Sequence, residues 1–280
     1  MPSIHQVFNS CGIASVLMAL KPNKNKMLDA FFRKLEQRVS KELKISKDRH
    51  DFQDRVQFAT AWLFIHALFN DERLFQHAND KLGMEHVKPL ILSRFDEMLL
   101  YQKTKNNHKI ESDMEKLAKK GTITRNLVDS YLDEQKTDIE LKLLAAMLGL
   151  VFEPVPETEG GSTLGTIVQI DPRHPETYMK KVRLLAKFIV DGAVLANYEY
   201  HWMPLREIGE EPGFANDIAE ISRLEDVELT PHYFKLNNPL SGMVLTVDKV
   251  SMLKRYTFYC FKLDTGLQEN AFQAMRGLAR

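Results

Sequence analysis

Ten residues near the N-terminus decide the expected fold: Gln6-Val7-Phe8-Asn9-Ser10-Cys11-Gly12-Ile13-Ala14-Ser15. Apolar residues after Cys11 recur at helical spacing up to Leu20, so a helix is expected to begin at the cysteine. The free N–H groups and positive end of a helix's first turn lower the pKa of a thiol there. Gln6 carries a side-chain amide that can donate to an oxyanion, and Gly12 lets a substrate approach closely. The stretch predicts a thiol nucleophile for acyl transfer, with a buried structural cysteine as the competing interpretation.

The chain from about residue 26 to residue 148 predicts helix almost throughout. Breaks are expected near 70–71, 82–83, 105–107 and 121, and the N-caps of the last two helices are expected in Thr122-Ile123-Thr124 and Thr137-Asp138. Residues 58–69 form the longest apolar stretch, which is too short to cross a bilayer and predicts a buried helix. Apolar stripes at helical spacing mark the faces expected in the core. One of these stripes consists of Val87, Leu90, Ile91, Phe95 and Leu99.

After residue 148 the pattern changes to short strands separated by loops and two helices. Strands are expected at 151–154, 166–170, 193–200, 202–208, 232–236 and 256–263, the third and fourth as one strand or two. Helices are expected at 176–190 and 215–224. The sequence therefore predicts an α+β fold, with a long helical block followed by a C-terminal antiparallel sheet. Cys260 is expected in the core of the last strand.

Composition narrows the class of protein. The 280 residues include 38 basic and 38 acidic side chains, so net charge does not favour nucleic acid or an anionic membrane as a partner. Two cysteines exclude a disulfide framework and make the cytoplasm the expected compartment. The N-terminus lacks the pattern of a signal peptide. Zinc, calcium, phosphate-loop and dinucleotide motifs are absent from the sequence, so neither a metal nor a cofactor is expected.

Four segments together resemble papain-like cysteine peptidases, most closely their bacteriocin-processing branch, and less closely the phytochelatin synthases. Residues 6–20 resemble the catalytic helix, and residues 138–150 resemble the second family helix. Residues 188–202 are similar to the family's helix, glycine turn, strand and histidine, and residues 233–239 to the strand that ends in Asn-Asp-Pro. The resemblance implies a papain-like catalytic core in residues 1–23 and 121–280. Residues 24–120 would then be a large helical insertion, which either recognises a substrate or partner or thickens the fold.

Carried over by position, the resemblance implies Cys11 as nucleophile, His201 as base, Asn238 as the residue that orients the base, and Gln6 as oxyanion donor. Two departures from the family stand out. Asn238 replaces the usual aspartate of this branch, and the step from Gln6 to Cys11 is one residue shorter than in papain. An asparagine oxygen can still accept the imidazole N–H. His232, which also begins an expected strand, is the rival to His201.

The function expected from these residues is that of an intracellular cysteine peptidase, which hydrolyses a peptide or isopeptide bond of a protein or peptide substrate. Two alternatives stay open. One is a papain-like acyltransferase or transpeptidase, and the other is a catalytically inactive peptidase fold used as a binding module. Trp202 either forms a wall of the site or packs beneath it.

Overall fold

The computed structural model describes residues 4–20, 26–76, 87–148, 150–154, 193–198, 201–210, 232–237, 239–240, 244–248, 257–263 and 278. Helices occupy most of the first half of the chain. They are α1 (Cys11–Leu20), α2 (Lys26–Glu42), α3 (Phe52–Phe69), α5 (Val87–Thr104), α6 (Ile110–Lys120), α7 (Arg125–Leu132) and α8 (Asp138–Met147).

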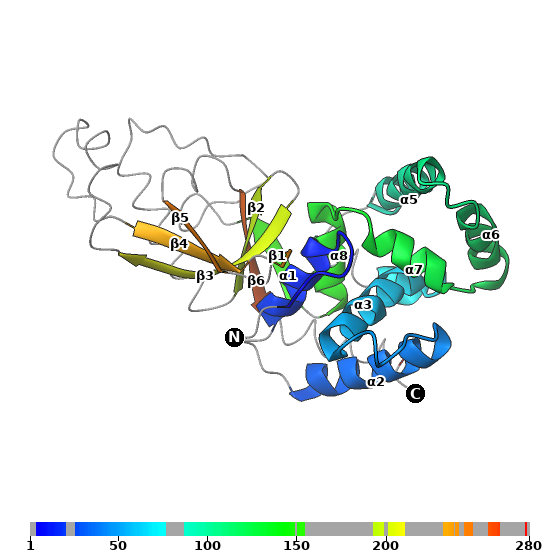
Figure 1. The fold of residues 1–280 in the computed structure, drawn as a ribbon, viewed down its shortest axis with the longest axis horizontal. Coiled ribbons are helices and arrows are strands. Elements are labelled where there is room, and N and C mark those ends of the chain that lie inside the picture. The colour runs from blue at the N-terminus through cyan, green and yellow to red at the C-terminus, as the bar shows by residue number, and fades with distance from the viewer. Residues whose placement is uncertain are drawn as a thin grey trace.

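The described strands form one antiparallel sheet in the order β1-β6-β2-β3-β4-β5. They are β1 (Leu150–Pro154), β2 (Ala193–Tyr198), β3 (His201–Glu210), β4 (His232–Asn237), β5 (Val244–Asp248) and β6 (Thr257–Leu263). Figure 1 shows the helices gathered beside the sheet, with α1 and α8 lying between the sheet and the other helices. The α+β prediction with an antiparallel sheet is confirmed at this level.

The centre of the helical part is α3, which is buried around almost its whole circumference. Residues 58–65 and 67–68 are each at most 2% exposed, as expected for a helix that is apolar on all sides. Arg55, in the first turn of α3, makes an ion pair with Glu36 on α2. Arg38, also on α2, lies over the ring of Trp62 and donates to the carbonyl of Leu278 at 2.7 Å. These contacts join α2, α3 and the end of the chain.

Side chains and one glycine define where the helices begin and end. The side chains of Asp51, Thr124 and Thr137 accept hydrogen bonds from the N–H groups of α3, α7 and α8, as N-caps do. Gly121 ends α6 with φ +64°, a left-handed conformation in which a side chain is strained. The caps Thr124 and Thr137 lie in the two segments predicted to contain them, and the break at Gly121 is confirmed.

Most predicted elements in the described residues are found, with some corrections. The breaks near 70–71 and 105–107 are confirmed, but the break between α2 and α3 and the whole of β5 were not predicted. Leu90 is 52% exposed, so its assignment to an apolar core stripe is wrong. β2 and β3 are two separate, paired strands, which decides between the one strand or two that were expected here. The break near 82–83, the strand at 166–170 and the helices at 176–190 and 215–224 lie outside the described residues.

The division into a catalytic core and a helical insertion stays a prediction. Residues from both predicted parts contribute to one hydrophobic core, which contains side chains of α1, α2, α3, α5, α6, α7 and α8. Within the described ranges, none of the helices has the length and apolar character needed to cross a bilayer.

Candidate functional site

Cys11 is the first residue of α1, and its side chain is 4% exposed. Burial is the largest influence on the thiol, and it raises the pKa above its ordinary value. Four smaller influences lower the pKa: the backbone N–H groups of Cys11, Gly12 and Trp202, and the positive charge of Lys136. The thiol is therefore buried against donors that favour its negatively charged form.

Two side chains one helical turn apart attach α1 to the start of β3. The backbone N–H of Trp202 donates to the sulfur of Cys11, and the hydroxyl of Ser15 donates to the carbonyl of Trp202 at 2.7 Å. In an antiparallel strand, the N–H and C=O of one residue point to the same side. α1 therefore covers the side of β3 that faces away from β2 at Trp202. The described pairing between β4 and β3 begins further along, at Leu205. This contact brings Cys11 next to the peptide group that joins His201 to Trp202.

Successive side chains of a strand leave opposite faces, and His201 and Trp202 differ accordingly. The indole of Trp202 is 2% exposed, donates to the carbonyl of Lys136 at 2.8 Å and packs 5.2 Å from the ring of Tyr259. Of the two interpretations of Trp202, the structure favours packing within the core. His201 is only partly buried, so the residue beside the thiol contact keeps a face toward solvent.

The register of the sheet separates His232 from Cys11. His232 pairs with Glu210, the last residue of β3, whereas the contact with Cys11 is at Trp202, near its first residue. The strand rises about 3.3 Å per residue, so these positions lie about 25 Å apart. His201 is therefore the histidine that β3 brings close to the cysteine.

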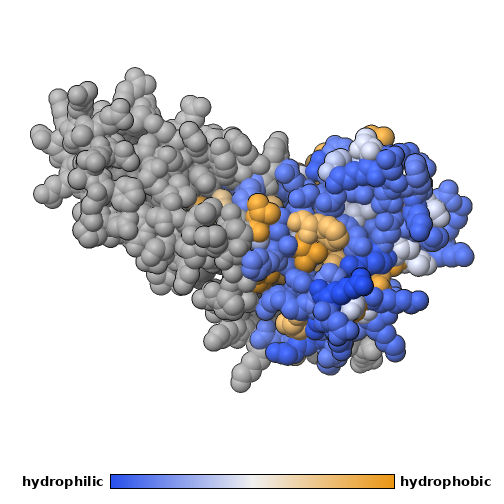
Figure 2. Space-filling model, in the orientation of Figure 1, coloured by the Kyte–Doolittle hydropathy of each residue, from blue (hydrophilic) through white to orange (hydrophobic). Residues whose placement is uncertain are grey.

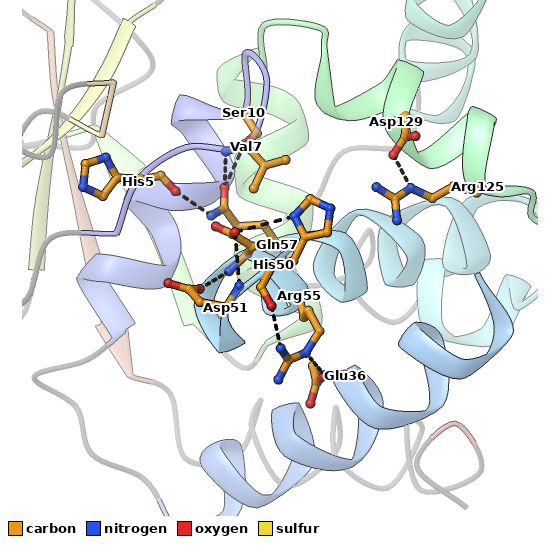
Figure 3. A network of polar contacts seen from close by, with 11 residues as sticks. His5, Val7, Ser10, Glu36, His50, Asp51, Arg55, Gln57, Arg125 and Asp129 are labelled. Atoms are coloured by element: carbon orange, nitrogen blue, oxygen red, sulfur yellow. Dashed lines mark hydrogen bonds and ion pairs between the residues drawn. The ribbon is translucent and has the colours of Figure 1, made fainter. Parts of the chain in front are cut away.

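The segment before Cys11 is attached to α3 through one buried glutamine. Figure 3 shows the side chain of Gln57 between His5, Val7 and Ser10. Its amide oxygen accepts from the N–H of Val7 at 3.0 Å and from the hydroxyl of Ser10 at 2.9 Å. Its amide nitrogen donates to the carbonyl of His5 at 2.7 Å. All the hydrogen-bonding groups of this side chain except one N–H therefore hold the loop that leads into α1.

A second set of contacts holds the same loop from the other side. Asn9 donates to the carbonyl and to the carboxylate of Asp133, at 2.9 and 3.0 Å, just after the end of α7. Lys105 donates to the same carboxylate at 2.6 Å, and this hydrogen bond raises the pKa of Lys105. The loop of the predicted nucleophile is therefore joined to Asp133 in the predicted core, and through Asp133 to Lys105 in the predicted helical insertion.

Gln6, the predicted oxyanion donor, uses part of its hydrogen-bonding capacity locally. Its backbone N–H donates to the carbonyl of Pro239 at 2.8 Å, and its side-chain nitrogen donates to the carbonyl of Phe8 at 2.7 Å. One amide hydrogen thus remains for other acceptors. Phe8 itself has φ +54°, an uncommon conformation for a bulky residue, and is 49% exposed.

Asn238, the predicted orienting residue, lies outside the described residues. Its neighbours on both sides are described: Asn237 ends β4, and Pro239 binds Gln6. The pairing of Leu236 with Leu205 puts this end of β4 at the same end of the sheet as His201. The chain on either side of position 238 therefore approaches the region of Cys11 and His201.

Gly12 is required for packing, which corrects the interpretation that it makes room for a substrate. A Cβ atom at this position would lie 3.0 Å from the Cβ of Lys136 and 3.2 Å from a methyl carbon of Leu141. Both distances are shorter than ordinary contacts between carbon atoms. Gly12 thus allows α1 to approach the start of α8.

Sequence reasoning missed Lys136 and Gln57, which are both buried polar residues at the site. Gln57 offered a signal, because it shares a helical face with Ala61 and Phe64, both in the core. Lys136 offered none, since it lies between Gln135 and Thr137 in a stretch whose sequence is typical of a polar loop.

In the described part of the chain, the outer surface and the remaining polar groups do not define another site. Figure 2 shows a mostly hydrophilic face over the helices, with apolar residues gathered near the position of α8 in Figure 1. Among the residues that the structure describes, there is no group of three or more His, Cys, Asp or Glu that could hold a metal ion.

Compared with protein-family models, with curated proteins and with solved structures, the chain gives no significant match.

Proposed function

We propose that this protein is a papain-like cysteine peptidase that hydrolyses a peptide or isopeptide bond, with Cys11 as nucleophile and His201 as base. The observation that carries the proposal is the contact between the first residue of α1 and the peptide group after His201. A helix that begins with the nucleophile and packs against a strand that begins with the base supplies both groups of a thiol hydrolase.

In the proposed reaction, His201 takes the proton of the thiol and the sulfur attacks the substrate carbonyl. The tetrahedral oxyanion accepts hydrogen bonds from the backbone N–H of Cys11 and from the remaining amide hydrogen of Gln6. The C–N bond then breaks, and His201 gives its proton to the departing amine. Water hydrolyses the resulting thioester and frees the thiol. Asn238 orients the imidazole in this scheme.

The experiment that tests the proposal is labelling with an electrophilic peptide, such as a peptide vinyl sulfone, followed by mass spectrometry of the labelled chain. Wild type and Cys260→Ser should be labelled at Cys11, whereas Cys11→Ala should not be labelled. His201→Ala should slow labelling at neutral pH by at least about tenfold, because general-base assistance contributes a factor of 10² or more. Labelling of Cys11→Ala at the rate of wild type would refute the proposal.

An inactive binding module is the second candidate, and the burial of Cys11 favours it. Structural cysteines that are buried and have a raised pKa are inert. The two candidates differ in how the thiol reacts with a small reagent: a peptidase nucleophile is alkylated by iodoacetamide in the folded chain, and a structural thiol reacts only after unfolding. Product analysis with added amines separates hydrolysis from the acyl-transfer alternative.

A protein or peptide substrate, a cytoplasmic location and recognition by the helical insertion belong to the same proposal. Two free thiols at most are available in the sequence, which fits a reducing compartment. The hydrogen bonds of Gln57 with Val7 and Ser10 support a link between the helical insertion and the loop before Cys11.

A further inference from the structure

We propose that Lys136 is a positioning residue for the Cys11 thiol: it connects the start of α1 to the start of β3 and holds a buried positive charge in the same part of the core. This inference rests on the proposed function, since it assigns Lys136 a part in preparing that nucleophile. It concerns a residue between α7 and α8 that lies outside the four segments of the resemblance.

The first part of the inference is mechanical. The Cβ and Cγ atoms of Lys136 pack against Gly12, directly after the cysteine. Its backbone carbonyl accepts the indole N–H of Trp202, directly after His201. One residue thus contacts the chain neighbours of both proposed reacting groups. Displacing it would shift α1 relative to β3.

The second part concerns the charge. The side chain of Lys136 is 1% exposed, and its ammonium group donates to the carbonyls of Tyr131 and Glu134 at the end of α7. It also lies 3.9 Å from the centre of the Tyr131 ring. Carbonyls at the C-terminal end of a helix and an aromatic face both stabilise a cation. The ammonium group is therefore fixed in position, and its charge acts on Cys11 without screening by bulk water.

The charged and titratable groups around Lys136 determine when the charge is present. Burial lowers the pKa of Lys136 to about 8, so the side chain is mostly protonated at neutral pH. Acidic groups and the Cys11 thiol oppose this lowering, while Arg94 adds to it. The neighbours come from every element packed around it: Cys11 on α1, Arg94 on α5, Tyr131 on α7, Glu134 after α7, Glu140 on α8 and, beyond Trp202, His201 on β3.

The test is the pH dependence of Cys11 alkylation by iodoacetamide in the full chain, followed on the peptide that contains Cys11 by mass spectrometry. Lys136→Met keeps the methylene stem and removes the charge. Lys136→Gln also removes the charge but keeps two N–H donors for the carbonyls of Tyr131 and Glu134. Lys142→Met is the matched control, because this lysine lies on α8 and pairs with Asp138 instead.

Both substitutions at position 136 should slow alkylation at pH 7 by about three- to tenfold and move the pH profile to higher pH, as a thiol pKa raised by half a unit to one unit requires. Lys142→Met should follow the wild type. A profile of folded Lys136→Gln that overlays the wild type would overturn the inference, since it would reduce Lys136 to a helix cap.

If neither variant at position 136 folds, the pH dependence of Cys11 alkylation in the wild type tests the inference instead. Coupling between a thiol and an ammonium group that titrate in the same range broadens the curve beyond that of a single proton. A single-proton curve would overturn the inference. These readouts need no peptide cleavage, so loss of the proposed peptidase activity and loss of the coupling are separate results.

Discussion

Replacing Gln57 by leucine removes the side chain that ties the segment before Cys11 to α3. Leucine is close to glutamine in size, so the change leaves no large cavity, but it takes away three hydrogen bonds. The hydroxyl of Ser10 is fully buried and the N–H of Val7 is half-buried, so both lose a partner that water replaces poorly. The carbonyl of His5 belongs to an exposed residue and can bind water.

The size of the effect follows from these three groups. A buried polar group that loses its partner costs about 1–3 kcal/mol. The Ser10 hydroxyl should bear this cost in full and the Val7 N–H in part, so Gln57→Leu should lower the free energy of unfolding by about 2–4 kcal/mol. That is a large share of the 5–15 kcal/mol typical of a domain. The loop before Cys11 should also loosen, which speeds alkylation of the thiol below the unfolding transition.

The assay is urea unfolding, with the midpoint and slope read separately so that a loss of stability is distinguished from a change in compactness. The matched variants are Ser10→Ala and the double variant that combines Ser10→Ala with Gln57→Leu. Because the double variant removes both partners, it should cost less than the sum of the single changes. A Gln57→Leu chain within about 0.5 kcal/mol of wild type, or strictly additive costs, would contradict the role given to Gln57.

Three further changes test the packing around the site. Gly12→Ala should destabilise the chain by about 1–2 kcal/mol in urea unfolding, because crowding against Lys136 and Leu141 exceeds the gain in helix propensity. Thr137→Ala should cost about 1 kcal/mol by the same measurement through loss of the N-cap of α8, while Thr137→Ser should not. The pKa of Lys136 is lowered to about 8 from 10.5, so the unfolded chain binds more protons between these values. The free energy of unfolding of wild type, measured relative to Lys136→Met, should therefore rise by up to about 3 kcal/mol as the pH increases through this window. Below pH 8 the destabilisation caused by burying the charged lysine should be fully present.

Each of these has a clear opposite outcome. A Gly12→Ala chain more stable than wild type would mean that α1 is not pressed against Lys136. Equal stability of Thr137→Ala and Thr137→Ser would mean that the hydroxyl does not cap α8. Parallel pH curves for wild type and Lys136→Met would mean that the buried lysine keeps its ordinary pKa.

Sequence periodicity predicted the helices well because their apolar faces repeat along the chain. The caps at Thr124 and Thr137 could be placed within two or three residues, since a cap depends on its own helix alone. The short strand β5 and the exposed position of Leu90 could not be found, because they depend on which elements pack together. The pair of Cys11 and His201 came from a family resemblance rather than from periodicity. Lys136 illustrates what local patterns miss: a lysine in a polar loop becomes a core residue only when α1, α7 and β3 enclose it.

The contact between Ser15 and Trp202 has a consequence for synthesis of the chain. The two residues are 187 positions apart, and a ribosome adding 5–20 residues per second needs roughly 10–40 s to cover that interval. During this time α1 has emerged without the strand that covers one of its faces. The nascent chain therefore carries a thiol and an apolar helix face that only later residues enclose, which makes this interval the period when oxidation and aggregation threaten it most.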